Sequence, residues 1–85
     1  MIDTKVIEKH LEELQYKYVA CETNINNLQY MINSIESEIK AANKEQLKTF
    51  EIQKEQLQEE LKTNEKAMKM HEANILFLNN KLWIS

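Results

Sequence analysis

Residues 41–47, AANKEQL, decide the fold of this chain, because a regular spacing of apolar residues changes phase there. Before this stretch the apolar positions alternate in steps of four and three residues, which is the heptad pattern of a helix that packs along one stripe. After it the same alternation resumes one residue out of phase. One extra residue rotates the stripe of a continuous helix by about 100°. The chain therefore either turns back here or forms one long coiled coil with a skip.

The apolar stripe, which we call the seam, has one half on each side of this stretch. Both halves keep the alternation over their whole length, and the second half includes three polar members, Lys54, Asn64 and His71. The first half consists of Ile7, Leu11, Leu14, Tyr18, Cys21, Ile25, Leu28, Ile32, Ile35, Ile39 and Ala42. The second half consists of Leu47, Phe50, Lys54, Leu57, Leu61, Asn64, Met68, His71, Ile75, Leu78 and Leu82.

Signals for the start of a helix lie at the phase change. Asn43 is a favoured N-cap residue, and Gln46 follows three residues later, as in a capping box. Asp3 holds the equivalent place before the first half of the seam. Asn also tolerates the left-handed conformation in which many helices end. These signals favour a turn, although the chain contains no Gly to make one.

We therefore predict an all-α fold, an antiparallel two-helix coiled-coil hairpin that forms one domain over residues 1–85. Its helices are expected at about 3–42 and 45–84, with the turn at about 42–45. The alternative is one long continuous helix in a parallel coiled coil.

A hairpin about this turn brings together seam residues whose numbers sum to 89. Ile35 then faces Lys54, and Tyr18 faces His71, where we expect a hydrogen-bonded polar layer. One flank of the seam contains Glu, Gln and Asn but no Lys, so we expect no salt bridge on that side. Its residues are Glu8, Gln15, Glu22, Gln29 and Glu36 in the first helix and Glu51, Gln58, Glu65, Glu72 and Asn79 in the second.

The opposite flank is mostly neutral, which suits a second packing surface. A two-helix hairpin buries little area per residue, so we expect self-association, with two hairpins forming a four-helix bundle. The residues predicted to mediate it are Met31, Ala67, Met70, Phe77 and Ile84.

Composition and motifs argue against an enzyme. With 85 residues the chain has too little interior for an enclosed active site. Cys21 and His71 lie near each other in the hairpin, but no orienting group or oxyanion donor accompanies them. The sequence HEANI, starting at His71, lacks the second His of a zinc-protease motif. We expect no catalytic residue, no cofactor and no metal.

Nucleic acid and membrane are also poor partners for this chain. Its formal charge is −3 and it contains no Arg, whereas phosphate contacts need clustered cations. A helical hairpin that binds RNA, as Rop does, is therefore only a weak alternative, based on analogy of fold. No apolar run is long enough for a membrane span. A single Cys and the lack of a signal peptide favour the cytoplasm, and the scarcity of Gly, Pro and Arg suits an AT-rich genome such as that of a phage.

What remains is contact with other proteins. Leu76 and Trp83 have no cover in the hairpin, and Tyr16 and Tyr30 are further aromatic anchors, so we predict that these four bind a partner. Aromatic residues could equally build the contact between protomers. The predicted function is a small coiled-coil adaptor or inhibitor that docks onto an unidentified protein, in addition to binding itself. The alternative is a structural or chaperone-like oligomeric spacer.

Overall fold

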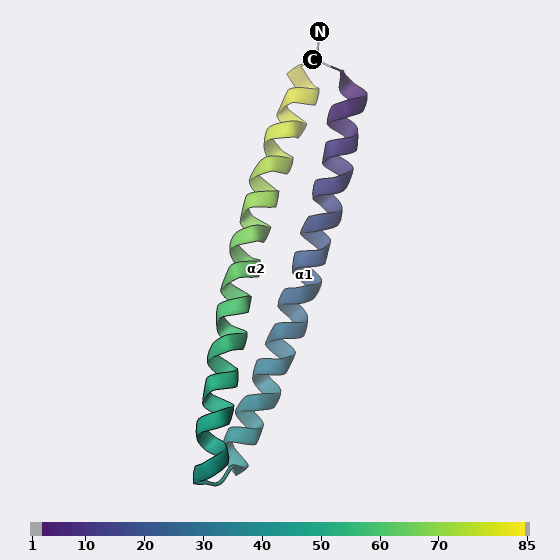
Figure 1. Cartoon of the computed structure of the whole chain (residues 1–85). Coiled ribbons are helices and arrows are strands. Elements are labelled where there is room, and N and C mark those ends of the chain that lie inside the picture. The colour runs from purple at the N-terminus through teal and green to yellow at the C-terminus, as the bar shows by residue number, and fades with distance from the viewer. Residues whose placement is uncertain (1–2, 85) are drawn as a thin grey trace.

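The computed structural model describes residues 3–84 and contains two α-helices that run antiparallel side by side (Figure 1). Helix α1 is Thr4–Ala41 and helix α2 is Lys44–Ile84. They form a rod of 65 × 14 × 14 Å with the turn at one end and both ends of the described chain at the other. The all-α hairpin is confirmed, and the single continuous helix is excluded.

The seam predicted from the heptad spacing lies between the two helices. Every one of its residues is shielded from solvent, whereas nearly all described residues outside it are exposed. The buried members are Ile7, Leu11, Leu28 and Ile32, and the others are half-buried. Within the described range, only Glu36 and Ala67 are shielded without being seam residues. The core is thus a single narrow stripe, which leaves much of each helix in contact with water.

Two polar contacts between the helices fix their register. Asn24 Nδ2 donates to Asn64 Oδ1 at 3.4 Å, and Lys54 Nζ lies 3.2 Å from Glu36 Oε1. Each pair lies one residue away from a predicted seam layer, because Asn64 was expected opposite Ile25 and Lys54 opposite Ile35. The two pairs sum to 88 and 90, on either side of the predicted sum of 89, and so support the predicted register.

Two expectations about polar groups were wrong. The flank without Lys does contain a salt bridge, because the long side chain of Lys54 leaves the seam and reaches Glu36. Tyr18 and His71 are both half-buried, but no hydrogen bond joins them in the described part of the chain. Their partly exposed positions allow each polar group to be satisfied by water instead.

Side-chain caps start both helices at the predicted residues. The Asp3 carboxylate accepts from the Lys5 N–H at 3.0 Å, and Asn43 Oδ1 accepts from the Gln46 N–H at 2.9 Å. A full capping box would add a second hydrogen bond, from the Asn43 N–H to the Gln46 side chain. The described contacts at Asn43 do not include it. Each cap satisfies a backbone donor that has no partner within its helix.

The turn consists of two residues, Ala42 and Asn43, so α2 begins one residue earlier than expected. Ala42 is extended, with φ −79° and ψ 147°, and its N–H donates to the Ile39 carbonyl at 3.3 Å. No residue in the described range has a positive φ. The left-handed conformation that Asn tolerates is therefore not used, and the chain turns without Gly through the extended Ala42.

Candidate protein-interaction surface

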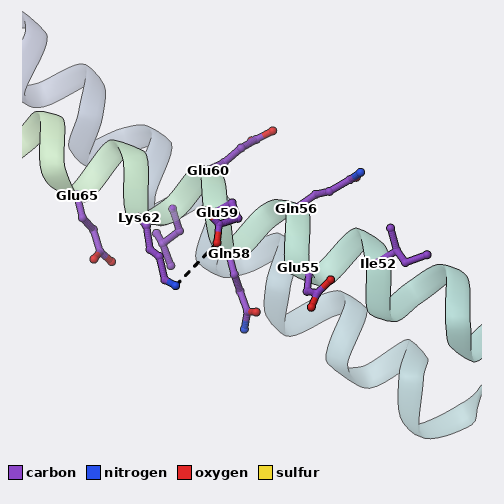
Figure 2. Close-up of a pocket in the computed structure, with 9 residues that line it drawn as sticks. Ile52, Glu55, Gln56, Gln58, Glu59, Glu60, Lys62 and Glu65 are labelled. Carbon is purple, nitrogen blue, oxygen red and sulfur yellow. Dashed lines mark ion pairs between the residues drawn. The ribbon is translucent and has the colours of Figure 1, made fainter.

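The hollows on this rod are open surfaces. One of them is lined by nine residues of the middle of α2, with no contribution from α1. Figure 2 shows Ile52, Gln56 and Glu60 pointing to one side of the helix, while Lys62 and Glu65 point to the other. Side chains that diverge in this way cannot enclose a small molecule.

Groups that could carry chemistry do not converge. Cys21 is a free, half-buried thiol within the seam. Across residues 3–84, no three His, Cys, Asp or Glu side chains lie close enough to hold a metal ion.

Exposed large apolar side chains are the most distinctive feature of the surface. Trp83 is 90% exposed, and Tyr16 and Tyr30 are 78% and 75% exposed. A rod with so thin a core leaves other apolar residues exposed as well: Val6, Val19, Met31, Ile52, Met70, Leu76 and Phe77. Single exposed apolar residues are normal, so the informative ones are those that gather where charge is scarce.

One group of exposed apolar residues lies at the end of α2, where charge is scarce. We call it the α2 terminal patch, and it consists of Met70, Leu76, Phe77 and Trp83. Residues 70–80 carry a single formal charge, at Glu72, which lies on the acidic flank. Lys81 Nζ lies 4.8 Å from the centroid of the Phe77 ring and makes a cation–π contact with it. Between Met70 and Trp83 the patch extends about 20 Å along the helix.

A groove that the sequence reasoning missed adjoins this patch. It is lined by Leu14 and Leu78 of the seam and by Phe77. The other residues that line it are His10, Glu13, Lys17 and Asn74. The sequence does indicate this groove. His10 and Asn74 occupy equivalent heptad positions next to the seam, one on each helix, and so lie where the two helices meet.

A second uncharged region lies on α1. Residues 18–35 carry one formal charge, at Glu22, which also belongs to the acidic flank. Tyr30 lies on the side of α1 turned away from α2, and Tyr16 continues the same row two heptads earlier. By contrast, the middle of α2 alternates Lys and Glu along its outer side.

The four predicted partner-binding residues fall on different sides of the rod. Tyr16 and Tyr30 lie on the outer side of α1, whereas Leu76 and Trp83 lie on the outer side of α2. The outer sides of two paired helices face away from each other, so these residues do not form one patch.

The residues predicted for self-association are also spread over the rod. Met31 is exposed on α1, and Met70 and Phe77 are exposed near the end of α2. Ala67 is half-buried beside the seam. The side chain of Ile84, the last residue of α2, lies outside the described part of the structure.

Comparison with protein-family models, with curated proteins and with solved structures gives no match. In the described range, neither helix has an apolar stretch that would let it cross a bilayer. Any proposal about function must therefore rest on the exposed surfaces themselves.

Proposed function

We propose that this hairpin is a non-enzymatic protein-interaction module, an adaptor or inhibitor that docks onto a protein target through the α2 terminal patch. The observation that carries the proposal is the exposure of Trp83 at 90%, one heptad from Leu76 in a part of α2 with little charge. We also place the protein in the cytoplasm, where its one unpaired thiol stays reduced.

The chemistry of the patch suits a protein partner. Interfaces are depleted of charge at their centre and enriched in aromatic residues and Met, which is the composition found here. Trp and Tyr are the residues whose removal most often costs binding energy. Phe77 and the groove that it lines add a concave surface of mixed polarity beside the flat side of the helix.

Self-association is the second part of the proposal. A free hairpin buries only its seam, and exposed apolar residues on both helices could be covered by another protomer. The sequence assigns this role to the set that includes Met31, Met70 and Phe77, and the exposure of these three side chains supports the assignment.

A structural or chaperone-like spacer is the second candidate function, and the 65 × 14 Å shape favours it. A long thin rod with both ends of the described chain at one end can separate or grip other chains. In that case Trp83 would contribute to assembly of the spacer and would not bind a dedicated target.

The docking proposal can be tested with variants of the patch and a matched control. Leu76→Ser and Trp83→Ser remove patch residues, while Ile52→Ser removes an equally exposed apolar residue from the charged middle of α2. Leu76 and Ile52 are 59% and 50% exposed. Each immobilised protein is incubated with an extract of the organism that encodes it, and retained proteins are identified by mass spectrometry. A true target is retained by the wild type and Ile52→Ser and lost from the other two.

Direct titration with the purified target completes the test. Trp83 is the only Trp in the chain, so its fluorescence reports on this one position. Its emission should move to shorter wavelength on binding, as the ring leaves water, and Leu76→Ser should weaken binding by at least about tenfold. A target that binds all variants equally, or that leaves the emission unchanged, would contradict docking through the patch.

A further inference from the structure

We propose that the outer face of α1 is where a second copy of this chain packs, antiparallel and across a two-fold axis near residue 25. This inference rests on the self-association proposed above, but it places the contact on a different surface from Met31, Met70 and Phe77 and names the register. The residues that form the face, which we call the α1 outer face, are Tyr16, Ala20, Thr23, Asn27, Tyr30 and Ser34.

These residues form a second heptad stripe. Their spacing alternates between four and three, as in the seam, but they lie on the opposite side of α1. All of them are exposed in the hairpin, and none is charged. A solvated helix normally carries its charges on the side away from its partner. The α1 outer face lacks them over about 27 Å, the length of residues 16–34.

The hairpin exposes more surface than a compact protein of its mass. The chain exposes 6970 Å², whereas a compact monomer of 10.1 kDa exposes about 5,300 Å² by the scaling of surface with mass. The excess is about 1,700 Å² per chain. Homodimers that are stable as folded units bury about 2,000 to 5,000 Å² in total, or half of that on each protomer. This excess lies within the range of area that one protomer of such a homodimer buries.

Charge favours a second copy over a different partner on this face. A two-fold interface places each patch against itself, so any net charge within the patch would face the same charge. The α1 outer face avoids this problem because it has no charge. The acidic flank of the seam, with residues such as Glu22 and Glu65, would repel its own copy.

The charges that border the face are complementary in one antiparallel register. When residues whose numbers sum to about 50 face each other, Tyr16 packs against the partner's Ser34 and Ala20 against the partner's Tyr30. Each large side chain then meets a small one, which lets the two stripes interdigitate. At the borders, Glu12 comes beside the partner's Lys40.

Sedimentation equilibrium tests the surface. The wild type should have twice the monomer mass of 10.1 kDa, and Tyr30→Lys and Ala20→Lys should raise the dimer dissociation constant by at least about tenfold. Both sites are exposed in the hairpin, so circular dichroism should show unchanged helicity. Ile52→Lys, on the outer side of α2, is the control and should leave the mass unchanged.

Disulfide trapping tests the register. In a Cys21→Ser background, Asn26→Cys lies next to its own copy across the axis and should give a disulfide-linked dimer on oxidation. Ser37→Cys should not, because its copy lies near the other end of the face. In the same way, Glu12→Lys should weaken the dimer, and the double variant Glu12→Lys with Lys40→Glu should restore it.

Each negative result of these experiments would contradict a different part of the proposal. A wild type that sediments at 10.1 kDa would overturn both self-association and this inference. A dimer whose mass is unaffected by Tyr30→Lys and Ala20→Lys would overturn the inference alone. Efficient trapping through Ser37→Cys would show a parallel pairing and overturn the register. Docking of a target is tested separately, since Trp83 lies on α2 and is intact in all these variants.

Discussion

Lys54 Nζ lies 3.2 Å from Glu36 Oε1, so a residue in the seam of α2 is neutralised by a carboxylate on the flank of α1. Both side chains are half-buried, and the aliphatic part of Lys54 continues the seam opposite Ile35. A cation among apolar layers stabilises little, but it penalises other registers, in which it would lack a carboxylate.

Replacing this cation should therefore stabilise the hairpin. We expect Lys54→Leu to raise the free energy of unfolding by about 1 kcal/mol, because an apolar side chain fills the seam without desolvating a charge. Glu36→Gln should lower it by less than about 1 kcal/mol, since the pair remains accessible to water. Urea unfolding followed by circular dichroism measures both. A Lys54→Leu protein less stable than the wild type would show that the ion pair is a net stabilising contact.

The Asn43 cap at the turn should contribute measurably to the free energy of unfolding, although Asn43 is exposed. Asn43→Ala removes the 2.9 Å hydrogen bond to the Gln46 N–H and should cost about 1 kcal/mol. Asn43→Asp keeps an acceptor at the same place and should retain most of the stability. Thermal unfolding of the two variants measures the difference. Equal losses would mean that the backbone of the turn, and not the cap, determines stability at this end.

Replacement of Leu28 and replacement of Leu76 by Ala should change the free energy of unfolding by very different amounts. Leu28 is buried in the seam, and its replacement by Ala should cost about 2 to 4 kcal/mol. Leu76→Ala should change the free energy of unfolding by less than about 0.5 kcal/mol, because that side chain is largely exposed. A large loss for Leu76→Ala that grows with protein concentration would place Leu76 in a contact between protomers.

Small-angle X-ray scattering should show the hairpin length in solution. The rod is 65 Å long with a Cα radius of gyration of 19.0 Å. Two rods in the register inferred above add less than about 10 Å to the length, whereas a continuous helix of this chain would reach about 120 Å. A maximum dimension beyond about 100 Å would contradict the hairpin in solution.

The heptad spacing predicted the seam, the turn and the register because side chains three and four residues apart lie on one side of a helix. This geometry depends only on the sequence and the helical repeat, so polar members such as Asn64 and His71 could be assigned along with the apolar ones. The caps at Asp3 and Asn43 were also predictable from the sequence, because each is a local contact between a side chain and a backbone N–H two or three residues away.

Features that depend on the path of a long side chain or on backbone dihedral angles were not predictable in this way. Lys54 was assigned to the seam, but its reach to Glu36 depends on several rotatable bonds. The extended turn at Ala42 was missed because Asn43 also permits a left-handed one. The sequence also named partner-binding residues without indicating whether they share one surface. Tyr16 and Leu76 lie at nearly the same level along the rod, but they lie on the outer sides of different helices.

The two-residue turn has a practical consequence for anyone who handles this protein. The described chain starts and ends at the same end of the rod, next to Trp83, so an affinity tag or fluorescent protein fused to either end would crowd the α2 terminal patch. Ala42 and Asn43 lie at the opposite end, and lengthening a surface loop costs little free energy. A short peptide epitope inserted between these two residues would let the protein be captured or immobilised with the patch fully open.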